Sequence, residues 1–280
     1  MTSLTDVPAP AKLNLFLHVT GRRPDGYHLL QSVFMLVDWC DTLHFELRRD
    51  GGISREDLSI ELPDDDLVVR SARALQQRTG TTLGAHIAVE KKIPAQAGMG
   101  GGSSDAASCL LALNRLWGLG LPASTLADIG LSLGADVPFF LSGGAAWVEG
   151  IGEQITPIDV PAARFCVLKP TEGLETAKIF ASPLLKRNSE TATISGFAAN
   201  PFGFGHNDLQ PVAEQLCPAI SEALAWLSQQ GLDGRMTGSG SAVFAVLPSG
   251  VPAPAFLPSP PWQARICSNL EAHPLKGWAS

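Results

Sequence analysis

The sequence has few charges and no excess of basic ones. Charged residues make up 17% of its 280 residues, with 20 Lys and Arg against 27 Asp and Glu. The net charge of -7 therefore argues against a broad basic face that binds nucleic acid. A small phosphorylated ligand is still compatible with this balance, because it needs only local positive potential.

Cysteines are also few and far apart. The five are Cys40, Cys109, Cys166, Cys217 and Cys267. Because no two are closely spaced, they indicate free thiols in a reducing cytoplasm rather than a disulfide framework or a metal site. The N-terminal residues lack a basic region followed by an apolar run, and no stretch of about 18 apolar residues occurs. We therefore expect a cytoplasmic protein with no secretory signal and no membrane partner.

What is present indicates a globular chain of one or two domains, with 45% hydrophobic residues. Alternating apolar residues predict a half-buried strand over 11–19, and further strands are expected at 41–49, 84–93, 143–150 and 164–170. Helical spacing predicts helices over 65–80, after the glycines at 100–102, and over 207–231, where Pro218 interrupts a helical pair.

The order of these elements predicts an α+β fold, because two or more strands precede the first helix. Pro157 and Pro161 favour a boundary near residue 160, which divides the chain into domains 1–160 and 161–280. The proline-rich stretch 246–263 is expected to be a surface loop before a final strand.

The stretch IPAQAGMGGGSSDAAS, residues 93–108, places three consecutive glycines and two serines directly before a helical pattern. Each glycine loses much conformational freedom on folding, so three in a row are costly. Their presence indicates that this backbone must be free of side chains. No Lys follows the glycines, so this is not a P-loop, and a Rossmann turn is only weakly matched. Backbone N–H groups at a helix N-terminus favour an anion site, with the hydroxyls of Ser103 and Ser104 nearby. A glycine-rich turn with a capping serine is the alternative.

Three segments together resemble the GHMP kinases, the superfamily named after galactokinase, homoserine kinase, mevalonate kinase and phosphomevalonate kinase. Residues 94–107 resemble its phosphate-binding motif, and MTGSGSAVFAV, residues 236–246, resembles its third, glycine-rich motif. Residues 8–34 are similar to the first motif of the branch that acts on 4-diphosphocytidyl-2-C-methyl-D-erythritol. The resemblance implies two α+β domains with the active site in the cleft between them. It assigns ATP binding to Pro94, Ala95, Gln96, Ala97, Gly98, Met99, Gly100, Gly101, Gly102, Ser103 and Ser104.

The resemblance also implies a catalytic pair. By period two, Lys12 and Asn14 share the strand face opposite the apolar side, about 7 Å apart. Lys12 matches a lysine that assists the reacting hydroxyl, and Asn14 matches a substrate contact; a solvated strand face is the alternative. Asp136 matches the general base, although an aspartate in a turn is more often a cap. Because Pro138 disfavours helix at Val137, we expect Asp136 at the end of an element, where Lys12 should keep it ionised.

The substrate residues follow from the same resemblance. Tyr27, the only tyrosine, is expected to stack on a cytosine ring and His28 to read its hydrogen-bonding edge. Phe180 matches the aromatic on the opposite face, with Thr176 nearby. The implied reaction transfers the γ-phosphoryl group of ATP to the 2-hydroxyl of this cytidine diphosphate-linked methylerythritol, with Mg²⁺ accompanying ATP and no metal ligand assigned.

Other functions fit parts of the pattern. Another small-molecule GHMP kinase, acting on homoserine or mevalonate, would share the two glycine-rich motifs. A non-catalytic binding protein of the same fold is an alternative of another class, and a dinucleotide oxidoreductase is a third.

Four charged residues near the loop have no assigned role. Asp66 stands where relatives often carry Asn, so a contact to adenine is left open. Asp105 could complement the helix dipole. Lys91 and Lys92 could supply positive charge or form a solvated face.

Overall fold

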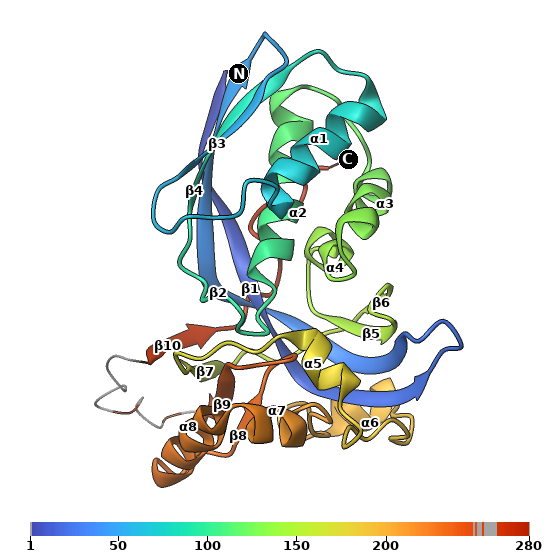
Figure 1. Ribbon diagram of the computed structural model, residues 1–280, viewed down its shortest axis with the longest axis vertical. Coiled ribbons are helices and arrows are strands. Elements are labelled where there is room, and N and C mark those ends of the chain that lie inside the picture. The colour runs from blue at the N-terminus through green and yellow to red at the C-terminus, as the bar shows by residue number, and fades with distance from the viewer. Residues whose placement is uncertain (1, 249, 251–253, 255–261, 280) are drawn as a thin grey trace.

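The computed structural model describes residues 2–248, 250, 254 and 262–279, so most of the predicted proline-rich loop lies outside the described residues. The described chain forms two sheets and eight helices (Figure 1). The first sheet contains β1 (Ser3–Arg22), β2 (His28–Arg48), β3 (Ile53–Asp57), β4 (Gly84–Glu90), β5 (Ala146–Gly150) and β6 (Gln154–Pro157). The second contains β7 (Arg164–Lys169), β8 (Gly234–Met236), β9 (Val243–Leu247) and β10 (Gln263–Ser268).

The described helices fall into two groups along the chain, four before β7 and four after it. Those of the first group are α1 (Leu67–Thr79), α2 (Gly101–Leu116), α3 (Ala123–Leu133) and α4 (Val137–Ser142). Those of the second are α5 (Thr176–Ala181), α6 (Ile194–Ala199), α7 (Gln210–Leu216) and α8 (Pro218–Gln229). The predicted helical pair is confirmed, since α7 ends and α8 begins on either side of Cys217. No described helix combines the length and apolarity needed to cross a bilayer.

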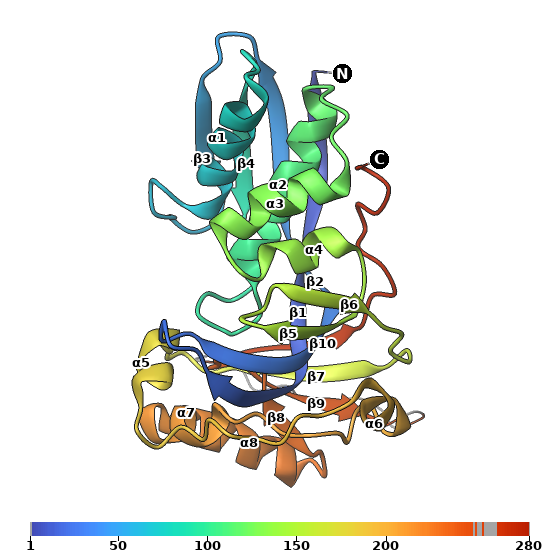
Figure 2. The ribbon, with the colours of Figure 1, turned by 90° about the vertical axis from the view of Figure 1, so that its right-hand side faces the viewer.

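The strands β1 and β2 join the two halves of the molecule. They have 20 and 21 residues and pair antiparallel from Ser3 opposite Glu46 to Arg22 opposite His28. At one end β2 also pairs with β4, and at the other with β5 (Figures 1 and 2). The prediction that the first strand is half-buried is wrong. Residues 11–19 are buried on both faces, since Ala11, Leu13 and Leu15 belong to the second core while Lys12 and Asn14 are buried on the other face.

Three hydrophobic cores lie one after another through the molecule. The first lies between the first sheet and α1–α4, and the second lies between β1, β2 and the second sheet. The third joins the second sheet to α7 and α8. The helix expected over 65–80 is confirmed as α1, which Gly80 ends in a left-handed conformation at φ 67°; the structure adds that Asp66 caps its N-terminus.

The chain returns to the first core near its C-terminus. Leu275 is buried there, and the N–H groups of Leu270 and His273 donate to carbonyls of Leu36 and Gly143, each at 2.9 Å. The change from the first sheet to the second falls between Pro157 and Arg164, but the domain limits 1–160 and 161–280 stay a prediction.

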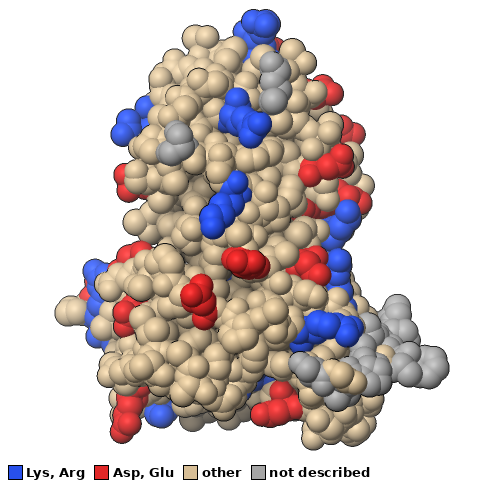
Figure 3. Space-filling model, turned by 180° about the vertical axis from the view of Figure 1, so that it is seen from behind, with Lys and Arg blue, Asp and Glu red and all other residues tan. Residues whose placement is uncertain are grey.

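The surface carries charges of both signs. On the face seen in Figure 3, Lys and Arg side chains are interspersed with Asp and Glu, and neither sign covers it.

Candidate active site

Two adjoining hollows lie beside the glycine-rich stretch. The inner cavity, about 280 Å³, is lined from β1 and β2 by Lys12, Asn14 and Ser32, and from the start of α4 by Asp136. The loop groove, about 710 Å³, is lined by residues 93–103. Both hollows are lined by Gly98, Gly100, Thr176 and Ser239. A ligand in one can therefore reach a ligand in the other at these residues.

The inner cavity holds an ion pair. Lys12 Nζ lies 3.7 Å from Asp136 Oδ2, and the lysine is 4% exposed while the aspartate is 33% exposed. Lys12 Nζ also donates to Asn14 Oδ1, so the structure brings these three predicted residues together. Burial lowers the pKa of Lys12, and the charge of Asp136 opposes this by raising it.

Asp136 stands at the end of an element, as the N-cap residue of α4. Although Pro138 was expected to disfavour helix at Val137, α4 begins at Val137 with the proline in its first turn. A proline is tolerated there, since the first N–H groups of a helix have no intrahelical partner.

A short chain of hydrogen bonds fixes the amide of Asn14. Its Nδ2 donates to Ser32 Oγ at 2.9 Å, and Ser32 Oγ donates to the carbonyl of Phe16 at 2.5 Å. The amide oxygen must then face Lys12 rather than Ser32. Sequence reasoning missed Ser32, because a serine paired across two strands has no local signature.

The loop backbone requires its glycines. Gly98 and Gly100 have φ of 70° and 72°, a region that favours glycine. A Cβ on Gly98 would lie 2.2 Å from the carbonyl oxygen of Thr237. The carbonyl of Met99 accepts the N–H of Lys12 at 2.9 Å, so the loop is registered directly on the strand that carries the lysine.

The third glycine-rich motif is hydrogen-bonded to the loop. The N–H groups of Ser241 and Ala242 donate to the carbonyls of Gln96 and Ala97, at 3.1 and 3.2 Å. Asn207 Nδ2 donates to two carbonyls of the motif, those of Met236 and Gly238, both at 2.8 Å. The motif thus holds the loop in place by hydrogen bonds, and Asn207 in turn holds the motif. Asn207 was not identified from the sequence.

The loop leads into the N-terminus of α2, where N–H groups point outward. Gly100 is its N-cap and has no side chain to cap them, so the N–H groups of the first turn can bind an anion. Ser103 lines the groove. The expectation for Ser104 needs correction, since its fully buried hydroxyl donates to the carbonyl of Pro10 at 2.7 Å and is not free for a phosphate.

A buried ion triad lies beneath the loop. Lys91 Nζ pairs with both Asp41 and Asp105, and all three side chains are at most 9% exposed. Asp41 also accepts the N–H of Ile93 at 2.8 Å. Lys91 is therefore neither a solvated residue nor a free positive charge, and Asp105 does not simply complement a dipole. Lys92, in contrast, is exposed and pairs with Glu90 at 2.7 Å.

The pKa values in the triad reflect its burial. Burial raises the pKa of Asp105 to about 8, with Lys91 opposing and Asp41 reinforcing the change. For Lys91, burial lowers the pKa, but the two aspartates together outweigh it and raise the value above the ordinary one.

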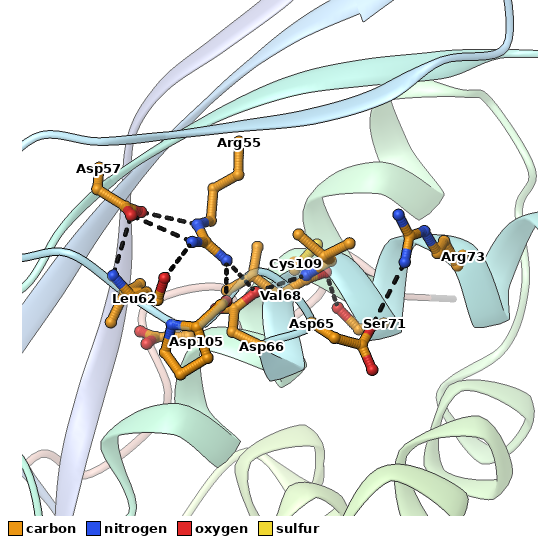
Figure 4. A network of polar contacts seen from close by, with 12 residues as sticks. Arg55, Asp57, Leu62, Asp65, Asp66, Val68, Ser71, Arg73, Asp105 and Cys109 are labelled. Carbon is orange, nitrogen blue, oxygen red and sulfur yellow. Dashed lines mark hydrogen bonds and ion pairs between the residues drawn. The ribbon is translucent and has the colours of Figure 1, made fainter.

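Asp66 lines the loop groove, but its carboxylate is already engaged in contacts within the protein. Its Oδ1 accepts the N–H of Val69 at 3.0 Å and pairs with Arg55 at 2.8 Å (Figure 4). Arg55 also pairs with Asp57 at 2.7 Å. An asparagine would cap the helix as well, but it would not balance the charge of Arg55.

The β1–β2 hairpin approaches α5 (Figure 2), and a third hollow lies between them. We call it the hairpin hollow; Tyr27, His28 and Phe180 line it. Tyr27 is 60% exposed, whereas the rings of His28 and Phe180 stack with centroids 4.8 Å apart and an interplanar angle of 27°. Phe180 lines the inner cavity too. Thr176 lies further in, with its hydroxyl 2.7 Å from that of Ser239.

Comparison with known proteins agrees with this geometry. Residues 66–144 match the family described as GHMP kinases N terminal domain, and residues 193–259 match GHMP kinases C terminal. The 4-diphosphocytidyl-2-C-methyl-D-erythritol kinase of Polaromonas sp. (strain JS666 / ATCC BAA-500) is 67% identical over 294 residues, which cover 99% of this chain and 95% of that protein. The enzyme of the same name from Variovorax paradoxus (strain S110) is 64% identical and matches over 100% of both chains. The chain belongs to the 4-diphosphocytidyl-2-C-methyl-D-erythritol kinases.

Solved structures agree with the fold of this kinase. A crystal structure of 4-(cytidine 5'-diphospho)-2C-methyl-D-erythritol kinase superposes with a TM-score of 0.74 at 32% identity, covering 87% of this chain and 89% of that one. Homoserine kinase from Cytophaga hutchinsonii ATCC 33406 superposes with a TM-score of 0.70 at 16% identity, covering 98% and 96% of the two chains; at that identity it shows the fold alone. The predicted α+β GHMP kinase fold is confirmed.

Proposed function

We propose that this kinase transfers the γ-phosphoryl group of ATP to the 2-hydroxyl of 4-diphosphocytidyl-2-C-methyl-D-erythritol in the cytoplasm, as a step of the non-mevalonate isoprenoid pathway. The observation that carries the proposal is the meeting of the two hollows at Gly98 and Gly100, with Lys12 and Asp136 on the wall of the inner one. ATP would occupy the loop groove and the alcohol the inner cavity. The names of the close relatives support this choice of substrate.

Phosphoryl transfer needs positioning and charge stabilisation more than covalent help from the protein. Asp136 would orient the 2-hydroxyl and take its proton as the bond from that oxygen to the γ-phosphorus forms and the bond to the ADP oxygen breaks. Lys12, held toward the cavity by Asn14, would stabilise the negative charge that develops on the transferred group. Burial lowers the pKa of Lys12, and the same burial strengthens the interaction of its charge with a bound ligand, because the local dielectric constant is low.

The triphosphate would be bound mainly by backbone. The left-handed glycines leave the loop open, and the uncapped N-terminus of α2 provides N–H donors. Mg²⁺ fits this arrangement, because it is usually held by substrate phosphates, waters and one or two protein oxygens. Ser103, which lines the loop groove, would supply such an oxygen. When bound, the ion neutralises charge on the phosphates.

The base would bind in the hairpin hollow. An exposed tyrosine gains from stacking on a base, and the ring of Phe180 lies between this hollow and the inner cavity. One ligand could therefore place its base beside Tyr27 and its alcohol beside Lys12.

The experiment compares the cytidine substrate with its uridine analogue in the wild type and in Tyr27→Ala. A uracil would leave two buried groups mismatched, each costing about 1–3 kcal/mol, so its kcat/KM should be at least about a hundredfold lower. Tyr27→Ala should lower kcat/KM for both compounds, since stacking is worth about 1–3 kcal/mol for any base. If the wild type has equal kcat/KM for the cytidine and uridine compounds, the proposed substrate is wrong. The protein would then be a GHMP kinase with another acceptor.

A further inference from the structure

Arg187, a residue that sequence reasoning did not single out, connects the two sides of the hairpin hollow. Its Nε donates to Nε2 of His28 at 3.0 Å. Its Nη2 donates to the carbonyls of Phe180 and Ser182, both at 2.8 Å, and its Nη1 to that of Leu185 at 3.0 Å. One guanidinium therefore holds the start of β2 against the end of α5.

These contacts decide the protonation of the His28 ring. A guanidinium only donates hydrogen bonds and stays charged, so Nε2 of His28 must be the acceptor. The imidazole is then neutral, with its proton on Nδ1. Burial lowers the pKa of His28, and the charges of Arg187 and Arg22 lower it further. In the described part of the chain, the bond from Arg187 is the only one to this ring.

A histidine held in this way offers a ligand one kind of contact. The Nδ1–H group donates and cannot accept, whereas a histidine free of Arg187 could take either tautomer. The ring also lines the hollow and stacks on Phe180, so its orientation is fixed as well as its proton. Cytosine presents an acceptor at N3, while uracil presents an N–H donor at the same position. A fixed donor facing N3 matches cytosine and leaves two donors opposed with uracil.

We propose that Arg187 is a specificity-determining positioning residue, which holds His28 as an Nδ1–H donor for N3 of a cytosine and so selects against uracil. This rests on the proposed function, because it takes the hairpin hollow to be the base site. Arg187 acts through His28 and touches no reacting atom.

The test measures kcat/KM for the cytidine substrate and the uridine analogue in the wild type, Arg187→Ala and Arg187→Lys. Arg187→Ala should lower the cytidine-to-uridine ratio at least about tenfold, because the freed ring can take the tautomer that accepts the N3–H group of uracil. Most of the loss should appear in KM for the cytidine compound. Arg187→Lys keeps a positively charged donor, so its cytidine-to-uridine ratio should stay closer to that of the wild type than the ratio of Arg187→Ala.

Arg22→Ala is the matched control. Arg22 lines the same hollow and also lowers the pKa of His28 by its charge, but its Nε donates to the carbonyl of Gly26 and not to the ring. It should leave the ratio near that of the wild type. If the two alanine variants change the ratio equally, charge alone is responsible and the proposal is wrong. An equal loss for both bases in Arg187→Ala would likewise reduce Arg187 to a structural residue.

Nitrogen NMR of the His28 ring provides a measurement that does not depend on the reaction. The free wild-type protein should show the proton on Nδ1, and Arg187→Ala should show a mixture of tautomers. A wild-type proton on Nε2 would overturn the proposal even if the enzyme is active. If Arg187→Ala does not fold, Arg187→Lys is measured instead, and an unchanged ratio with a changed tautomer would exclude base reading by His28. A wild type inactive on both compounds would refute the proposed function but not the Nδ1–H assignment, which NMR tests separately.

Discussion

Two lysines lie close to the glycine-rich loop, and their surroundings give them opposite properties. Lys12 and Lys91 are only 4% and 9% exposed, and each pairs with aspartate. Lys91 has two partners that are almost fully buried, whereas the single carboxylate paired with Lys12 is 33% exposed. The pKa of Lys91 is raised as a result, and that of Lys12 is lowered.

The difference shows that a buried lysine can either hold a structural contact or present its charge to a ligand. The triad of Lys91 ties the end of β4 to β2 and to the first turns of α2, and so fixes the floor of the loop groove. Lys12 lines the inner cavity and is paired with a single, partly exposed carboxylate, whereas Lys91 lines the loop groove and is paired with two buried carboxylates. A ligand with developing negative charge should therefore gain more from Lys12 than from Lys91.

The largest expected effect concerns the partner of Lys12. Asp136→Asn keeps the shape but removes the base and the charge, so kcat should fall at least about a hundredfold, and up to about ten-thousandfold. Binding of the cytidine substrate, measured by calorimetry, should persist. Turnover close to that of the wild type would remove Asp136 from the mechanism. The assignment of Lys12 and its partner to chemistry, in contrast to Lys91, would then be lost as well.

The second prediction sets the two lysines against each other in stability. Lys91→Met removes the buried cation that pairs with Asp41 and Asp105, and should lower the free energy of unfolding by about 3–5 kcal/mol. Lys12→Met should cost less, because Asp136 can be hydrated, yet it should abolish most activity. Urea unfolding of both variants gives the comparison, and equal destabilisation would contradict the different roles assigned to the two lysines.

The third prediction concerns the loop above the triad. A Cβ on Gly101 would lie 3.2 Å from Ile93 Cγ2 and 3.4 Å from Lys91 Nζ, so Gly101→Val must push the loop or the triad aside. The affinity for ATP should fall at least about tenfold, which corresponds to about 1.4 kcal/mol, while affinity for the cytidine substrate should change little. Unchanged ATP binding in a folded variant would make the glycine-rich stretch a structural turn.

The last prediction concerns how the stability of the triad depends on pH. Because the pKa of Asp105 is about 8 in the folded protein and about 3.9 when unfolded, the unfolded state binds fewer protons between these values. Stability should therefore fall as the pH rises from about 4 to 8. Asp105→Asn lacks this titration, so its free energy of unfolding should fall less across that range. Identical pH profiles would mean that Asp105 is ionised throughout in the folded protein.

The sequence predicts best what depends on local backbone. Glycines that need left-handed φ, such as Gly98 and Gly100, leave a clear pattern, and alternation places Lys12 and Asn14 on one strand face. The roles of Lys91, Ser32 and Arg187 depend on partners up to 159 residues away. A serine or an arginine has no local signature for such contacts, and a lysine beside a loop gives no sign that two distant aspartates will bury it.

The return of residues 270–279 to the first core has a consequence for biosynthesis. The guanidinium of Arg115, on α2, stacks over the ring of Trp278 at 4.7 Å, and Leu275 fills the same core at 3% exposure. A ribosome makes about 5–20 residues per second from the N-terminus, so α2, which begins in the glycine-rich loop, emerges long before the residues that cover it. The nascent first half must wait with apolar surface uncovered while the second half is made. The first core is therefore completed only after residues 270–279 have been made, and shorter nascent chains expose its apolar surface to chaperones and proteases.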